Sequence, residues 1–398
     1  MRRLLSAIML GLFCFIVAMP AWAAETYPVY ISPGGEAESI ETQAVSRDGV
    51  TYLPMRTLFE GCNASVQWNG VTRTITATRL DGAVLKLDMR RNTAELTAQG
   101  KTEKLLMPQK GYVQNGVTYL PLRFVGETLH CGVIWDEPQK AVKVYQGLMT
   151  QTDTQGKSYL IDLYSGDFYR GFGAQAVRIG NCGIADSFKL GDGNYGRPWT
   201  WEVEMTAGGN YLLQCDYDFT GSRIHIVYFV SYINANTGEA HFDAAEDSVF
   251  CQQAGDLIYL RDNTGALLTI NDKMGTSNRL DLPKLVKETP GGAELENILP
   301  LAVDGDYIFF RSNYRLNLLM FDMANKKLTN MKDVLITDAV AARTGVKLDD
   351  PWWQYIDPYA VQVEGPYLYF VKLEDGILYA ELRSYLDFVT VPLEYKYR

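Results

Sequence analysis

The chain has 398 residues, of which 47% are apolar and 12% aromatic, and its formal net charge is −10. This composition can build sizeable cores and excludes a disordered chain. The acidic balance, with no basic stripe along the sequence, argues against nucleic acid and anionic membrane surfaces as partners, because both are bound through Lys and Arg.

The first 23 residues have the pattern of a secretory signal peptide. An apolar run over residues 4–17 follows a basic start, and the small residues Ala21 and Ala23 mark a cleavage site before Ala24. We therefore expect residues 1–23 to be removed and the protein to be secreted, extracellular or held in the cell envelope. No later stretch has the ~18–20 apolar residues that a membrane helix needs, so we expect no transmembrane segment after cleavage.

One segment of the chain occurs twice. DGVTYLPMR at 48–56 returns as NGVTYLPLR at 115–123, an offset of 67 residues, and both copies continue without a gap to Trp68 and Trp135. In each copy the Asp-Gly or Asn-Gly pair predicts a tight turn, Val-Thr-Tyr-Leu a strand, and the proline a helix start. A strand ending in tryptophan and a returning strand follow. Each copy should therefore be a strand, a helix and a hairpin, with the apolar stripe of the helix on the sheet.

An arginine stands at the same place in both copies, Arg56 and Arg123. Its recurrence one residue after the predicted helix start fits a buried ion pair that orients the helix against the sheet, or an exposed contact. We favour the structural role.

These residues resemble a known family. YLPLRFVGETL at 119–129, a valine strand ending in Trp135-Asp136 and the closing AVKV at 141–144 are similar to the copper amine oxidase-like N-terminal domain, the stalk module. The resemblance implies a small α+β domain over residues 24–147, a form joined to many unrelated partners in secreted bacterial proteins. It also implies that the module is not itself the copper site.

Amine oxidase chemistry is not expected from this chain. Such an enzyme needs an Asn-Tyr-Asp or Asn-Tyr-Glu segment for its quinone, and the Asn-Tyr pairs at Asn194, Asn210 and Asn313 are followed by other residues. The histidines lack the close spacing of metal ligands: His130, His225 and His241. We therefore predict no metal site and no cofactor.

The cysteines after the signal peptide are odd in number: Cys62, Cys131, Cys182, Cys215 and Cys251. An odd set in a chain of this size favours buried free thiols over a disulfide framework. In the repeat Cys62 aligns with Leu129 and Cys131 with Ala64, so we interpret both as small apolar fillers. A bridge between Cys215 and Cys251 is the alternative.

The rest of the chain carries a weaker repeat. Residues 148–158, with Thr, Gln, Asp and Gly, predict a linker. Within 159–398, turn glycines precede apolar strands at spacings of 46, 50 and 60 residues, each with a second strand about a dozen residues later: Gly209, Gly255, Gly305 and Gly365. Paired strands at this period predict a β-propeller-like domain of about five or six blades, closed by residues 159–163 meeting 389–393. The chain should be mainly β, and a pair of β-sandwiches is the alternative.

Two segments interrupt this rhythm, residues 274–300 and 333–344, and we interpret both as blade insertions. Propellers build binding surfaces from such loops. Paired tryptophans beside carboxylates can stack on a sugar ring or capture a peptide, and they can equally anchor an insertion to the body. The candidate binding residues that follow are Asp349, Asp350, Trp352, Trp353 and Tyr355.

No catalytic motif emerges, so the leading hypothesis is a non-catalytic secreted or cell-envelope protein. Its stalk module would position or anchor the chain, and its β-repeat domain would bind or assemble, with cell-wall polysaccharide or an envelope protein as partner. One alternative is a propeller-type polysaccharide hydrolase or lyase that uses carboxylates from the clusters Asp243, Glu246 and Asp247, or Asp304 and Asp306. Another is an assembly subunit with a large exposed apolar patch.

Overall fold

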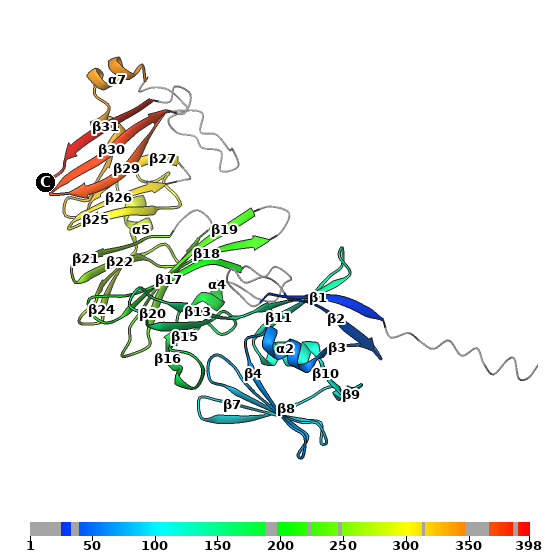
Figure 1. Cartoon of the computed structure of the whole chain (residues 1–398). Coiled ribbons are helices and arrows are strands. Elements are labelled where there is room, and N and C mark those ends of the chain that lie inside the picture. The colour runs from blue at the N-terminus through cyan, green and yellow to red at the C-terminus, as the bar shows by residue number, and fades with distance from the viewer. Residues whose placement is uncertain are drawn as a thin grey trace, which may run out of the picture. The chain divides into compact units, whose positions relative to one another are not determined.

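The computed structural model describes residues 25–32, 40–187, 197–220, 224–245, 249–312, 315–346, 366–384 and 389–398. The chain is mainly β and divides into two compact units, Met1–Gly147 and Leu148–Arg398 (Figure 1). The predicted signal peptide lies outside the described residues. Within them, no helix combines the length and the apolar character needed to cross a membrane.

The N-terminal unit is built on two sheets. The larger has the order β11-β12-β1-β2-β3-β10-β9 and the smaller runs from β4 to β8 in chain order. The strands of the larger sheet are β1 (Thr26–Ser32), β2 (Ile40–Arg47), β3 (Val50–Pro54), β9 (Tyr112–Gln114), β10 (Val117–Pro121), β11 (Cys131–Asp136) and β12 (Ala141–Gln146). Those of the smaller are β4 (Ser65–Asn69), β5 (Thr74–Thr78), β6 (Val84–Asp88), β7 (Thr93–Ala98) and β8 (Lys101–Leu106). Helices α2 (Met55–Gly61) and α3 (Leu122–Thr128) follow β3 and β10.

The predicted strand, helix and hairpin occur in both copies of the repeat. Asp48 and Asn115 both have a φ of 51°, which is the left-handed geometry that the tight turns require. Each helix begins directly after its proline, Pro54 or Pro121. Local sequence therefore determines local structure in the same way twice.

The two copies are related by a local two-fold axis. β3 and β10 pair antiparallel with Leu53 opposite Leu120, which occupy the same position of the repeat. Pro54 lies opposite Tyr119, and Tyr52 lies opposite Pro121. These are the same two repeat positions with the two strands exchanged. Such self-complementary pairing is the geometry of a symmetric dimer, here within one chain.

The copies differ in where their hairpins go. In the second copy β12 pairs parallel with β1, so the β11–β12 hairpin completes the larger sheet. In the first copy the β4–β5 hairpin is continued by β6, β7 and β8 into the smaller sheet. One core joins both sheets and both helices, and it includes Ile31, Phe59, Leu87, Leu120 and Val125.

The described part of the C-terminal unit contains five consecutive antiparallel sheets in which chain neighbours pair, coloured from green to red in Figure 1. The first two comprise β13 (Leu148–Thr152), β14 (Ser158–Asp162), β15 (Asp167–Arg170) and β16 (Val177–Asn181), then β17 (Arg197–Met205), β18 (Tyr211–Thr220), β19 (Ile224–Ile233) and β20 (Ala240–Ala245). The next two comprise β21 (Cys251–Ala254), β22 (Leu257–Arg261), β23 (Leu267–Asn271) and β24 (Thr276–Leu280), then β25 (Leu299–Asp304), β26 (Tyr307–Ser312), β27 (Arg315–Asp322) and β28 (Lys327–Asn330). The fifth has β29 (Pro366–Glu374), β30 (Ile377–Ser384) and β31 (Val389–Lys396) among the described residues.

Short helices lie beside these sheets: η1 (Gly173–Gln175), α4 (Ile184–Ser187), α5 (Leu282–Lys287), α6 (Met331–Leu335) and α7 (Asp338–Thr344). The repeat glycines Gly209, Gly255 and Gly305 have positive φ values of 81°, 61° and 61°, and each precedes a strand as predicted. The up-and-down sheets following one another are the blade arrangement of a propeller, and the mainly β, propeller-like prediction is confirmed at that level.

Three details of the prediction were wrong. Residues 148–152 of the predicted linker are β13, which pairs with β14. β14 is bonded to β13 on one side and β15 on the other, so it has no free edge with which residues 389–393 could close a ring. The predicted insertion at 274–300 contains β24, the fourth strand of its sheet, besides α5. Sequence patterns indicated strands here but not which neighbour each strand would pair with.

Asp272 connects the second and third sheets. It follows β23, is 1% exposed, and accepts hydrogen bonds from the Thr206 hydroxyl (2.7 Å), the Gly208 amide (2.5 Å), Asn210 Nδ2 (3.0 Å) and the Tyr232 hydroxyl (3.3 Å). All four donors belong to the second sheet or its β17–β18 turn. The carboxylate is therefore a structural link between neighbouring sheets.

Candidate functional site

The predicted binding residues Asp349, Asp350, Trp352, Trp353 and Tyr355 all lie outside the described residues. They stay predictions. The features below come from the part of the chain that the structure describes.

A pocket of about 470 Å³ lies beside α3 in the N-terminal unit, and we call it the α3 pocket. Its walls come from the β2–β3 turn and β3, the loop before β9, the start of α3, and strands β11 and β12. The residues used below are Val50, Arg123, Glu127, Val133, Trp135 and Val142. Both copies of the repeat thus contribute, since Val50 belongs to the first and the others to the second.

The helix α3 presents a charged pair to the pocket. Because α3 starts at Leu122, Arg123 and Glu127 lie one turn apart on its exposed side, and their charged groups are 3.5 Å apart. In the first copy Arg56 and Glu60 form the same exposed pair at 3.7 Å. The favoured interpretation of the repeated arginine, a buried ion pair between helix and sheet, was therefore wrong. The helical period in fact argues against burial, because the stripe of Leu122 and Val125 that faces the core leaves Arg123 on the outer side of α3.

Trp135 forms a rigid aromatic wall of the pocket. Its side chain is 39% exposed near the end of β11, and the Tyr27 ring packs against it edge to face at 5.1 Å. The indole Nε1 donates to Glu137 Oε2 at 2.5 Å. Hydrogen bonds from Lys140 and then from Trp135 hold the pKa of Glu137 below its usual range. These contacts fix the ring while leaving part of it open to solvent.

Trp68 is the equivalent of Trp135 in the first copy of the repeat. It occupies the same repeat position as Trp135 and is 43% exposed, but it lies on β4 in the smaller sheet and does not line the pocket. The sequence motif contained both tryptophans, and nothing in it distinguished them. The available signal was the stretch between residues 79 and 110, which has no counterpart after the second copy and forms β6, β7 and β8.

The α3 pocket combines apolar walls with a few polar groups. Val50, Val133 and Val142 give an apolar lining, Trp135 gives a ring face, and Arg123 with Glu127 gives one donor and one acceptor. Small-molecule sites typically combine an apolar cavity with a few placed polar groups. Among the described residues that line it, Glu127 is the one carboxylate, so the paired acids of a glycoside hydrolase are not found there.

The carboxylates considered for a hydrolase are used in packing instead. Asp243 on β20 pairs with Arg261 on β22 at 2.7 Å, and burial raises its pKa to about 6 against the opposing effect of Arg261. Asp304 on β25 accepts hydrogen bonds from the Tyr397 hydroxyl (2.6 Å) and forms an ion pair with Arg398 (3.0 Å). Each of these contacts joins two neighbouring sheets.

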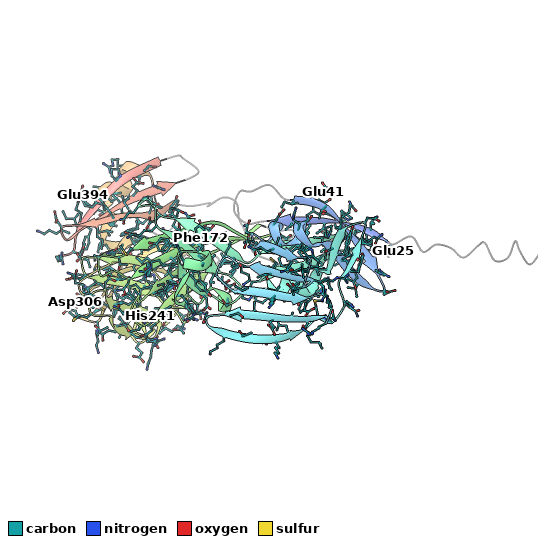
Figure 2. The ribbon with its side chains drawn as sticks, turned by 60° about the horizontal axis from the view of Figure 1, so that its bottom comes forward. Glu25, Glu41, Phe172, His241, Asp306 and Glu394 are labelled. Atoms are coloured by element: carbon teal, nitrogen blue, oxygen red, sulfur yellow. The ribbon has the colours of Figure 1, made fainter. Side chains whose placement is uncertain are left out.

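Of the remaining acids of those clusters, Asp306 is the one that the structure describes. Figure 2 shows Asp306 at the edge of the C-terminal unit, where it is exposed in the β25–β26 turn. Glu246 and Asp247 lie outside the described residues. Of the described acids, Asp243 belongs to the second sheet and Asp304 to the fourth, and each has an arginine partner.

The cysteine thiols are all free in the described chain, and four are buried: Cys62, Cys131, Cys182 and Cys215. The alternative of a bridge between Cys215 and Cys251 was wrong. Cys215 lies on β18 with Leu213 in one core, whereas Cys251 packs against the core that contains Leu212. Successive strand residues face opposite sides, so the two thiols lie on opposite faces of that sheet.

A copper centre does not fit the described residues. Among them no three His, Cys, Asp or Glu side chains are placed to hold a metal ion. His241 is 3.8 Å from Glu239 at the surface, and the side chain of His225 is not described.

Residues 34–144 match the family model described as the copper amine oxidase N-terminal domain. The N-terminal unit carries this domain. The match confirms the family resemblance and covers less than half of the chain. Every residue that lines the α3 pocket lies within the matched range of the copper amine oxidase N-terminal domain.

Other comparisons reach the whole chain only at low similarity. No curated protein matches it. Similar solved structures include YCF48 from Cyanidioschyzon merolae, with 11% identity, a TM-score of 0.24 and coverage of 95% of this chain and 97% of that chain. BamB from Moraxella catarrhalis has 11% identity, a TM-score of 0.24 and coverage of 95% and 94%. The WD40 domain of SCAP from fission yeast has 11% identity and a TM-score of 0.22, and the match covers 83% of this chain but 62% of that one. The blade-like description therefore rests on the strand pairing itself.

Proposed function

We propose that the chain is a non-catalytic protein of the cell envelope or exterior. In this proposal the copper amine oxidase N-terminal domain holds a segment of neutral cell-wall polysaccharide in the α3 pocket. The observation that carries the proposal is the rigid, partly exposed Trp135 beside the Arg123–Glu127 pair.

The pocket suits the two sides of a sugar ring. A pyranose has an apolar face of C–H groups, which packs on an indole, and hydroxyls around its rim that both donate and accept hydrogen bonds. Trp135 offers the ring face, Arg123 offers donors, and Glu127 offers an acceptor. A volume of about 470 Å³ lies within the range usual for small-ligand sites.

Charge and targeting limit the choice of polymer. The formal net charge of −10 disfavours an anionic chain, which supports a neutral polysaccharide. The signal-peptide pattern of residues 1–23 supports a location where such a polymer is present. The C-terminal unit would then display its blade-like sheets and the predicted residues 349–355 to a second ligand or an assembly partner.

The test is co-sedimentation of residues 24–398 with purified insoluble neutral wall polysaccharide, titrated over salt. Trp135→Ala should weaken binding by about 30-fold, as expected for an aromatic anchor that the bound ligand covers. Trp68→Ala is the matched control, since it removes the same residue at the equivalent, similarly exposed position outside the pocket. Arg123→Ala should also weaken binding, and Arg56→Ala should not.

Three results would reject the proposal. Equal binding by the two tryptophan variants would remove the pocket from the interaction. Absence of pelleting with the polymer would favour an envelope protein as partner. Release of soluble sugar during the incubation would show an enzyme, which contradicts a purely binding role.

A further inference from the structure

Two thiols of the N-terminal unit contact each other. The Cys131 and Cys62 thiols interact, and both side chains lie in the same core, where Cys131 Sγ also donates to the Leu129 carbonyl at 3.9 Å. Cys62 caps the end of α2 in the first copy of the repeat, and Cys131 opens β11 in the second. A bond between them would close a loop across the two copies.

Neighbouring contacts hold the two segments together on either side of the thiols. Gln146 lies opposite Cys131 in the β11–β12 ladder. Its Oε1 accepts a hydrogen bond from Asn63 Nδ2 at 2.6 Å, and its Nε2 donates to the Cys62 carbonyl at 3.5 Å. The backbone around the thiols is therefore positioned by contacts that do not involve sulfur.

The repeat shows that thiols are not needed to fill this place. The positions equivalent to Cys62 and Cys131 are Leu129 and Ala64, which lie in the same core. In the repeat alignment, these two residues are the counterparts of the two cysteines. Apolar side chains therefore fill these positions in the other copy, and packing alone does not require cysteine at Cys62 or Cys131.

We propose that Cys62 and Cys131 form a disulfide when the chain folds in the presence of a disulfide oxidant, such as a thiol–disulfide oxidoreductase or a low-molecular-weight disulfide. One cysteine thiolate attacks the oxidant's disulfide, forming a mixed disulfide and releasing one oxidant thiolate. The second cysteine thiolate then attacks the mixed disulfide at the cysteine sulfur and releases the other. The two cysteines lose two protons and two electrons, and the oxidant's disulfide is reduced to two thiol groups.

The bond must form before the core closes. In the folded unit Cys62 is 3% exposed and Cys131 is fully buried, so an oxidant cannot reach either sulfur. The hydrogen bond with Cys62 and then burial raise the pKa of the Cys131 thiol well above its usual value, which disfavours the attacking thiolate. Oxidation therefore belongs to folding outside the cytoplasm, and this timing rests on the location proposed above.

The test refolds residues 24–398 in a buffer of reduced and oxidised glutathione, so that it does not depend on polysaccharide binding or on where the protein resides. After denaturation without reductant, three thiols should react with N-ethylmaleimide, and five after reduction. Peptide mapping should link Cys62 to Cys131. Five reactive thiols before reduction, or a link between other cysteines such as Cys182 and Cys215, would overturn the proposal.

A second arm measures stability. Dithiothreitol should lower the melting temperature of the N-terminal unit in the oxidised wild type by about 10 °C, because the bond closes a long loop. The double variant Cys62→Leu with Cys131→Ala takes its side chains from the repeat's other half, and its melting temperature should not respond to dithiothreitol. Cys182→Ala, in the C-terminal unit, should keep the full response. A wild type that does not respond would contradict the inference.

Discussion

Replacing Asp272 by alanine should lower the free energy of unfolding of the C-terminal unit by about 4 kcal/mol. The carboxylate accepts four hydrogen bonds, and three of the donors are on side chains that are themselves buried, Thr206, Asn210 and Tyr232. Each bond to a charged group contributes roughly 1.5–3 kcal/mol, and water entering the vacated space recovers part of the total.

The control for this variant is Asp322→Ala. Asp322 is 8% exposed at the end of β27, and it accepts hydrogen bonds from the amide and the side chain of Asn325 in its own turn. Its loss should lower the free energy of unfolding by about 1 kcal/mol, since no second sheet depends on it. Urea unfolding followed by tryptophan fluorescence measures both variants. Equal losses for the two variants would refute the assignment of Asp272 as a link between sheets.

The same site predicts acid sensitivity. Burial raises the pKa of Asp272, but the hydrogen bonds from Asn210, Thr206, Gly208 and Tyr232 outweigh it, so the pKa lies below the usual value. The unfolded chain therefore binds this proton more readily than the folded chain. The stabilisation is present above the unfolded pKa and is lost as the pH falls through the folded pKa. The asparagine of Asp272→Asn cannot ionise. The difference in free energy of unfolding between the wild type and this variant should therefore become smaller as the pH falls.

Three further variants test other contacts. Asp243→Asn should abolish a fall of about 2 kcal/mol in the free energy of unfolding between pH 4 and 7, because the folded pKa of about 6 lies above the unfolded value and the native state loses stability as the pH rises; an unchanged pH profile would contradict this. Gly183→Ala should cost about 2–4 kcal/mol in denaturant unfolding, since φ is +81° and the new Cβ would lie 2.2 Å from the Phe242 ring; a neutral variant would refute the close approach. Arg79→Met should cost about 3–5 kcal/mol because it leaves a buried carboxylate two residues away unpaired, and a loss below 1 kcal/mol would contradict that ion pair.

Local features of the N-terminal unit could be predicted from sequence. The turns at Asp48-Gly49 and Asn115-Gly116, and the helix starts after Pro54 and Pro121, follow from backbone preferences that act over a few residues. The destination of each hairpin could not be predicted. That choice depends on contacts between segments far apart in sequence, such as the parallel pairing of β12 with β1.

The candidate site shows the same division. Trp135 and Arg123 were recognised as recurring residues, but their exposure is set by neighbours from other segments. The pocket needs Val50 from the first copy beside residues of the second. The spacing of apolar residues within one copy of the repeat does not predict which residues of the two copies lie side by side. Likewise, aligning Cys62 with Leu129 indicated apolar fillers, and the contact between the two thiols emerged only from the folded arrangement.

The antiparallel junction of β3 with β10 makes the two halves of the N-terminal unit partners in the sense of a dimer. A chain carrying one copy would leave the β3 edge without its hydrogen-bonding neighbour. Two such chains could restore the ladder by pairing Leu53 with Leu53 across a true symmetry axis. Covalent fusion of the copies removes the dependence of that pairing on protein concentration. It also allows each half to change without a matching change in the other. In this chain the β4–β5 hairpin extends into a second sheet, and the β11–β12 hairpin borders the α3 pocket.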